Sequence, residues 1–195
     1  MTKIIGYQKL ETTKNRKKWY QLPNLKPSRI VVPKSMMDTM FIPISREPII
    51  VDHRLYTCEN KNPDKLWKYL NSTFFMLVVE LFSRRLGGGA LDIKVEDYKL
   101  MPVPDLDRID FTYDENQLFS RSPAIYFKEV MEKSKVSLDE AVAKALGFVN
   151  AEDVVEQLHK DYVEVVEDRL IKADRPLKRK SSELAEKEEE DDKDN

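Results

Sequence analysis

The sequence is poor in the residues from which many catalytic and metal sites are built. Its 195 residues include one cysteine, Cys58, and two histidines, His53 and His159. A single cysteine excludes an internal disulfide and gives no indication of an oxidising compartment. The two histidines lie in separate regions, and neither has metal-ligand spacing to Cys58. We therefore expect no metal site in this chain.

Long apolar runs are also absent. The longest, Phe74 to Val79, is followed by Glu80 and is far shorter than a membrane span requires. The N-terminal residues MTKIIGYQKL lack the apolar core of a secretory signal. We expect a chain without membrane contact that is located in the cytoplasm.

Glycine is scarce, and three of the five glycines stand together in the stretch SRRLGGGALDIK. The run Gly87–Gly89 lacks the Lys-Ser/Thr of a Walker-type phosphate loop, and it does not fit the dinucleotide pattern G-x-G-x-x-G. The acidic residues of the C-terminal region are predicted to lie on exposed, solvated helix faces. We therefore expect no catalytic residues in this chain.

Charge of each sign is concentrated in a different half of the chain. The net charge of −2 divides into +8 over residues 1–104 and −10 over residues 105–195. Residues 1–35 hold nine Lys and Arg against the single acidic residue Glu11. A basic segment attracts polyanions through counterion release. The first half is therefore either a contact surface for a polyanion, which its interleaved aromatic residues favour, or an ordinary solvated surface.

Prolines interrupt the first 60 residues and exclude a long helix there. Between the prolines lie short apolar segments that are partly β-branched. These segments predict strands over residues 29–32, 40–44, 49–51 and 56–58.

A long apolar helix is expected next. Asn62 is its N-cap, and a proline takes the first helical position. Apolar side chains recur at helical spacing along the segment, which predicts a buried helix. Arg84 and Arg85 then complement the negative end of the helix dipole, and Gly87 caps it. A strand over residues 90–95 follows.

The second half of the chain is expected to be helical. Residues 105–136 predict an irregular linker, and residues 137–175 predict C-terminal helices that begin with a capping box of Ser137 and Glu140. Residues 176–195 contain almost no apolar side chains and predict a disordered acidic tail. The predicted fold class is α+β: a twisted, mostly antiparallel sheet with one buried helix, followed by the helical C-terminal region and the tail.

Several segments occur together in an order typical of one group of proteins. They are RKKWYQL at 16–22, SRIVVPKSMMDTMFIP at 28–43, LNS at 70–72, GGGA at 87–90 and LMPVP at 100–104. This series resembles the C-terminal target-recognition region of adenine-specific (N6) DNA methyltransferases of restriction–modification systems. The LNS helix, the GGGA run and the closing P-x-P are also similar to the DNA-specificity subunits of type I restriction enzymes.

Two later segments resemble the closing helices of the same methyltransferase group. They are SLDEAVAKALGF at 137–148 and VEDRLIKA at 166–173, so the resemblance spans residues 14–173. The catalytic region of the group carries a glycine-rich cofactor loop and an Asn/Asp-Pro-Pro-Tyr/Phe motif. Nothing in this sequence matches either one, since the segment NPDK at 62–65 lacks the second proline and the aromatic residue.

The resemblance implies that residues 1–104 form a basic DNA target-recognition domain. It implies double-stranded DNA as one partner and a catalytic methyltransferase domain or subunit as another. S-adenosylmethionine would be bound by the complete enzyme, and no cofactor would be bound by this chain. By itself the chain is expected to transfer no methyl group, although it belongs to a DNA adenine methyltransferase on this interpretation.

The residues expected to contact DNA are of three kinds. Lysines are expected at phosphates, because lysine is a point charge without a fixed fork. Arginines beside strand ends can read guanine in bidentate fashion, and aromatic side chains can stack on bases or sugars. The full set is Lys14, Arg16, Lys17, Lys18, Trp19, Tyr20, Lys34, Arg46, Arg54, Arg84, Arg85, Gly87, Gly88 and Gly89.

Two interpretations of the glycine run stay open. A loop without side chains lets the backbone approach phosphates, with Arg84 and Arg85 adding charge beside it. Alternatively, Gly87–Gly89 only permit a tight reversal of the chain against the core. Both can hold at once.

Two other functions are compatible with the sequence. One is a stand-alone nucleic-acid-binding protein without a methyltransferase partner. The other is a protein–protein adaptor, in which a helix over residues 150–173 docks on a partner and the basic half is merely solvated. Phosphate binding gives a steep dependence on salt concentration, and an adaptor gives none.

Overall fold

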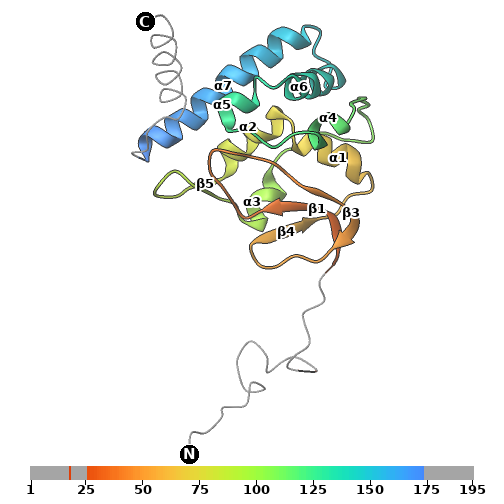
Figure 1. The fold of residues 1–195 in the computed structure, drawn as a ribbon, viewed down its shortest axis with the longest axis vertical. Helices are drawn as coiled ribbons and strands as arrows, with labels where there is room; N and C mark the ends of the chain where they lie inside the picture. Colours follow the sequence, from red (N-terminus) through yellow and green to blue (C-terminus); the bar gives the residue numbers. More distant parts are fainter. Residues whose placement is uncertain (1–17, 19–25, 174–195) are drawn as a thin grey trace, which may run out of the picture.

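Lys18 and residues 26–173 are described by the computed structural model, which is shown in Figure 1. The acidic segment 176–195, predicted to be a disordered tail, lies outside these residues. The described part contains two small antiparallel sheets and seven helices. The predicted α+β fold is confirmed, with two sheets in place of the single one expected.

The first sheet has the strand order β3–β1–β4, with β1 (Ser28–Pro33) between β3 (Ile44–Ile49) and β4 (Leu55–Cys58). Both pairings are antiparallel. The β-branched residues Ile30 and Val32 of the central strand are buried in the main core. Two of the predicted strands, at 29–32 and 56–58, are therefore confirmed.

The second sheet has the strand order β2–β6–β5 and is also antiparallel. It consists of β2 (Ser35–Met36), β6 (Leu91–Asp92) and β5 (Arg84–Arg85). The strand predicted over 90–95 is shorter than expected. Its last residue belongs to helix α3 (Val95–Leu100), whose start is capped by a side chain of its own first turn.

The strand predicted over residues 40–44 does not form, apart from Ile44 at the start of β3. The N–H group of Ile42 donates to Asn71 Oδ1 at 3.0 Å. The Ile42 carbonyl accepts from Asn71 Nδ2 at 3.0 Å and from Trp67 Nε1 at 2.6 Å. Side chains thus satisfy the backbone groups that a neighbouring strand would otherwise pair.

The long helix predicted after Asn62 is two helices, α1 (Pro63–Leu70) and α2 (Thr73–Phe82). Ser72 has extended backbone (ψ 155°), and its Oγ accepts the N–H group of Phe75 at 3.4 Å. It is therefore the N-cap of a new helix. The single-helix prediction was wrong because the side chain of Asn71, directly before Ser72, is bonded to the backbone of Ile42.

The prediction for the end of this helical region was also wrong. The C-cap of α2 is Ser83, so Arg84 and Arg85 do not lie at a helix end. They form β5, and Gly87 is part of the turn that follows.

Four helices make up the second half of the described chain. They are α4 (Asn116–Phe119), α5 (Tyr126–Glu129), α6 (Lys133–Ala145) and α7 (Ala151–Lys172). Helix α6 starts four residues earlier than predicted. Ser137 therefore lies inside the helix and is not its cap, because the burial of the first turn draws that turn into the core.

The elements form three layers, as Figure 1 shows. The β3–β1–β4 sheet lies on one side, α1 and α2 lie in the middle, and α6 and α7 lie on the other side. One main hydrophobic core runs from β1 to α7. Residues 105–136, predicted to be an irregular linker, contribute these buried residues to it: Leu106, Phe111, Tyr113, Leu118, Tyr126, Phe127 and Val130.

Among the described residues, no helix has both the length and the apolar character that a bilayer requires.

Candidate functional site

The second sheet presents a short hairpin on the surface. Strands β5 and β6 pair in antiparallel register, with Arg84 opposite Asp92 and Arg85 opposite Leu91. The turn between them is closed by the Leu86 N–H group, which donates to the Ala90 carbonyl at 2.8 Å. Both arginines are exposed. In Figure 1 this hairpin projects from the left of the molecule.

Two of the three glycines are required by the backbone of this turn. Gly88 has φ 81° and Gly89 has φ 78°, values in the left-handed region that other residues rarely adopt. Gly87 has no such requirement, and a Cβ atom added there would meet nothing within 4 Å. The tight-reversal interpretation thus accounts for Gly88 and Gly89. It does not account for Gly87, which is exposed, whereas Gly88 is partly buried and Gly89 is buried.

The two arginines differ in their partners. Arg85 Nη1 lies 3.4 Å from Asp168 Oδ2 of α7, in an exposed ion pair. Lys172 Nζ lies 2.7 Å from the same oxygen. The side chain of Arg84 makes no hydrogen bond or ion pair with any described residue. Both guanidinium groups are therefore accessible to an anion, since an exposed pair of this length contributes little.

A buried ion pair between Arg169 and Glu80 lies next to the turn of the hairpin. Arg169 of α7 donates to Glu80 of α2 through Nε at 2.9 Å and Nη2 at 2.8 Å. The same guanidinium donates to the carbonyl oxygen of Gly89 and, at 2.7 Å, to that of Met37. The side chains of Arg169 and Glu80 are 1% and 4% exposed. The glycine turn is thereby tied to two helices.

Two further predicted residues lie next to this sheet. The Lys34 N–H group donates to the Arg54 carbonyl at 3.2 Å, and the Lys34 carbonyl accepts from Ile93 at 2.9 Å. The next residue, Ser35, pairs with Asp92, which pairs with Arg84 in turn. Two strand spacings, about 10 Å, separate the ends of this row. Lys34 and Arg54 are thus joined to the hairpin through the backbone of the second sheet.

A surface groove of about 700 Å³ adjoins Lys34. Its charged lining comprises Lys26, Lys34 and Asp52, with His53 beside them. The groove therefore extends the basic character of this region toward the start of β1.

Arg46 lies elsewhere. In β3, Ile44 pairs with Ile30 and Ile49 pairs with Ser28, so a longer stretch of β3 lies opposite a shorter stretch of β1. The strand therefore bulges, and Arg46 lies in the bulge. Figure 1 shows β3 and β5 at opposite sides of the view. Arg46 and the hairpin therefore do not form one cluster.

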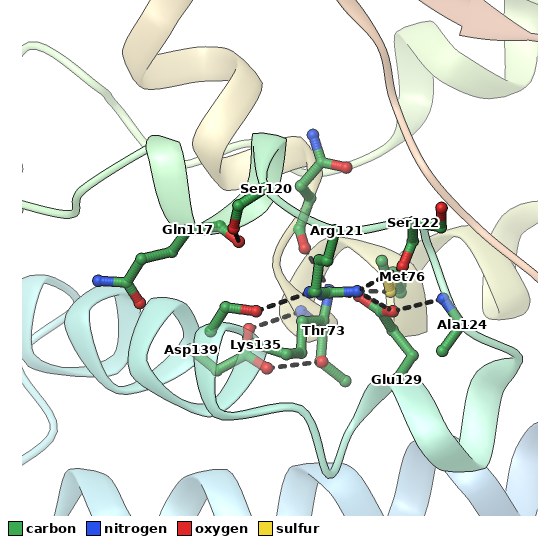
Figure 2. Close-up of polar contacts among 12 residues, drawn as sticks. Thr73, Met76, Gln117, Ser120, Arg121, Ser122, Ala124, Glu129, Lys135 and Asp139 are labelled. Atoms are coloured by element: carbon green, nitrogen blue, oxygen red, sulfur yellow. Dashed lines mark hydrogen bonds and ion pairs between the residues drawn. The ribbon is translucent and has the colours of Figure 1, made fainter.

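A second group of polar side chains is buried between α2, α5 and α6 (Figure 2). Asp139 of α6 is fully buried and accepts from the Thr73 N–H group at 2.7 Å and from Thr73 Oγ1 at 2.6 Å. His159 Nε2 of α7 lies 2.7 Å from Asp139 Oδ2. One carboxylate thus joins the start of α2 to both C-terminal helices. The expectation that the acidic residues of this region are solvated is wrong for Asp139.

Lys135 lies in the same group and is fully buried. Its ammonium donates to the Asn71 carbonyl and, at 3.2 Å, to Met76 Sδ. Burial lowers the pKa of Lys135, although the nearby carboxylates of Asp139 and Glu129 act in the opposite direction. It holds the break between α1 and α2 against α6, and it is closed off from solvent.

With this geometry in hand, the chain was compared with known proteins. Residues 5–142 match the family described as Type II methyltransferase M.Eco57I, C-terminal domain. The chain belongs to this family. No curated protein and no solved structure matches it. The predicted resemblance to the C-terminal region of restriction–modification methyltransferases is confirmed.

Of the residues predicted to contact DNA in this methyltransferase C-terminal domain, the structure connects the hairpin residues with Lys34 and Arg54. It places Arg46 apart, and Lys18 is exposed. The remaining predicted residues, Lys14, Arg16, Lys17, Trp19 and Tyr20, lie outside the described residues. Contact of any of them with DNA stays a prediction.

Sequence reasoning missed Arg169 and Asp139. A signal for Arg169 was present, because Glu80 interrupts the longest apolar run, and a charge inside a buried helix requires a partner. No comparable signal marked Asp139. Its role depends on Thr73, which lies 66 positions away.

The described residues contain no group of three or more His, Cys, Asp or Glu side chains that could hold a metal ion. Burial, followed by the charge of Glu59, raises the pKa of the Cys58 thiol. A raised pKa makes Cys58 a poor nucleophile near neutral pH.

Arg121 and Glu129 form an ion pair whose strength should depend on pH. Arg121 Nη1 and Nη2 donate to the Glu129 carboxylate at 2.8 Å and 2.6 Å. Burial acts to raise the pKa of Glu129, but hydrogen bonds from Arg121 and the Ala124 N–H group and the charge of Lys135 outweigh it, so the pKa is lowered. A lowered carboxyl pKa stabilises the fold above the ordinary pKa. That contribution is lost as the pH falls through the lowered value.

We therefore expect the free energy of unfolding to decline on acidification below about pH 4.5. The decline should be shallower in Glu129→Gln than in the wild type. Urea denaturation at several pH values measures it, with exposed Glu164→Gln as the control. Equal acid slopes for the wild type and Glu129→Gln would contradict the assignment.

Proposed function

We propose that this chain is the DNA target-recognition portion of a restriction–modification methyltransferase that methylates adenine at N6. The observation that carries the proposal is the exposed Arg84–Arg85 hairpin, with its side-chain-free turn, in a chain of a methyltransferase C-terminal family. The N6-adenine assignment follows from the sequence resemblance. The partner is double-stranded DNA.

The hairpin has the properties of a phosphate-binding element. A guanidinium group offers a planar fork of donors that fits phosphate, and a turn without side chains allows the DNA backbone to come close. Arg84 is without a protein partner among the described residues, and Arg85 has only an exposed one. The backbone of Lys34 is bonded to Ile93 and Arg54, so these two basic residues add positive charge beside the second sheet. Arg46 on the β3 bulge would belong to a separate contact.

Methyl transfer is assigned to a catalytic domain or subunit that holds S-adenosylmethionine. The glycine turn of this chain joins two antiparallel strands, whereas a cofactor loop of the dinucleotide type joins a strand to a helix. The glycine turn therefore lacks the setting of such a cofactor loop, which supports this assignment. Adenine methylation that depends on both this chain and a catalytic portion would distinguish this role from that of a stand-alone DNA-binding protein.

We expect the wild-type chain to bind duplex DNA with an affinity that falls steeply as salt rises. Arg84→Ala/Arg85→Ala should weaken binding and reduce the slope of log K against log salt by about one to two units, because each lost phosphate contact removes about 0.9 unit. Fluorescence anisotropy titrations between low and physiological salt measure both quantities.

The matched control is Lys144→Ala/Lys160→Ala. It removes the same charge from exposed lysines that pair with Glu140 and Glu156 on the C-terminal helices. It should leave the slope close to that of the wild type. If both double variants lower affinity equally, binding follows net charge and the hairpin has no special role. A wild-type chain without any salt-dependent DNA binding would favour the adaptor function.

A further inference from the structure

We propose that Arg169 is a positioning residue for the hairpin, and that the end of α7 thereby sets the orientation of Arg84 and Arg85 toward DNA. The inference rests on the proposed function of the hairpin. It adds a residue outside 5–142, the range over which the family match extends.

The first argument is the geometry of the Arg169 guanidinium. It contacts three separate segments at once: the Glu80 carboxylate of α2, the Gly89 carbonyl of the turn, and the Met37 carbonyl after β2. Only a guanidinium fork can donate in so many fixed directions from one buried position. The side chain is 1% exposed, so water cannot take over these contacts.

The second argument is that the hairpin cannot fix its own orientation. Strands β5 and β6 and their neighbour β2 contain two residues each, and a sheet of this size is marginal without further support. Its turn contains two glycines with positive φ, which are the residues with the greatest conformational freedom when unfolded. The hydrogen bond from Arg169 to the Gly89 carbonyl therefore orders the glycine turn, which is the most flexible part of the hairpin.

The third argument is that α7 reaches the hairpin at a second point. Asp168, the residue before Arg169, pairs with Arg85 at 3.4 Å. One contact holds the back of the turn, and the other holds the side chain of an expected DNA-binding residue. The Asp168 contact is exposed and weak, but it shows that two adjacent residues of α7 both lie against the hairpin.

The test uses a variant that removes the positioning contact and keeps the fold. Arg169→Met alone would leave Glu80 as a buried unpaired charge and could unfold the chain. The paired variant Glu80→Met/Arg169→Met removes both charges and fills their space with apolar side chains. Replacing a buried ion pair in this way is often neutral for stability. We therefore expect the pair to melt cooperatively near the wild-type temperature.

In this paired variant we expect DNA affinity to fall about tenfold and the salt slope to decrease by about one unit. A merely structural role would leave the salt slope unchanged well below the melting temperature. Arg169→Lys, which keeps the charge and loses the fork, should reproduce the loss of slope. A folded Glu80→Met/Arg169→Met variant that binds DNA with wild-type affinity and slope would overturn the proposal.

A second readout is independent of DNA. The Leu86 N–H group, which closes the turn, should exchange with solvent at least about tenfold faster in the paired variant, because the turn opens more often. The N–H groups of β1 should exchange at unchanged rates. Faster exchange at Leu86 in a chain that does not bind DNA supports the positioning role while the proposed function fails. Unchanged exchange at Leu86 refutes the positioning role whether or not DNA binds.

Discussion

Replacing Asp139 by alanine is expected to lower the free energy of unfolding by about 3–5 kcal/mol. The change removes the acceptor of two buried donors on Thr73 and the partner of His159, which is partly exposed. Each donor left buried without an acceptor costs about 1–3 kcal/mol. These contacts join α2, α6 and α7, so their loss should weaken the packing among these three helices. Figure 2 shows the contact between Thr73 and Asp139.

Chemical denaturation followed by circular dichroism measures this loss. Asp161→Ala is the matched control, because Asp161 is exposed on α7 and, among the described residues, bonds only with the Gln157 side chain one turn away. That variant should change stability by less than about 0.5 kcal/mol. If Asp139→Ala is no more destabilising than Asp161→Ala, the buried carboxylate does not hold the helices together.

Replacing Trp67 by alanine should have a comparable effect, a loss of about 3–5 kcal/mol. Trp67 is 1% exposed, and its ring stacks on Phe119 with centroids 4.9 Å apart. Its Nε1–H group donates to the Ile42 carbonyl at 2.6 Å. Trp67 thus fills part of the main hydrophobic core and also fixes the segment before β3. Alanine would leave a large cavity and a loose segment.

Trp67→Phe separates these two roles. Phenylalanine keeps most of the buried ring and loses the indole donor, while the Ile42 carbonyl still accepts from Asn71 at 3.0 Å. We expect this variant to cost about 1–2 kcal/mol, well below alanine. Thermal melting of the two variants gives the order directly. Equal losses for phenylalanine and alanine would show that the hydrogen bond, and not the packed ring, dominates.

Several elements of the fold follow from local sequence. The β-branched residues 30–32 specify β1 because branched side chains fit a pleated strand in the core. The apolar repeat along 151–172 specifies α7, since that spacing places its buried residues on one face. Order and spacing of short segments also identified the family, although no single segment was specific. The two elements depend on residues close to one another in the chain, and the family depends on the linear order of segments, so none of these features requires knowledge of tertiary contacts.

Other elements could not be predicted in this way. The break between α1 and α2 depends on Asn71, whose side chain pairs with the backbone of Ile42. The sequence pattern around Asn71 is helical on both sides, so local propensity favoured one helix. Likewise, Arg84 and Arg85 are well suited to a helix end. Pairing with β6 decided that they form a strand.

The candidate site divides in the same way. By itself the sequence determined that the chain has a basic half and a glycine run beside two arginines, because charge and backbone freedom are properties of each residue. Tertiary structure alone decided that Arg169 reaches the turn from 80 positions away. It also decided that Ser35, the residue after Lys34, lies in register with Asp92 and Arg84. Such contacts are selected by the packing of whole elements, and no local pattern encodes which distant residue will satisfy a buried charge.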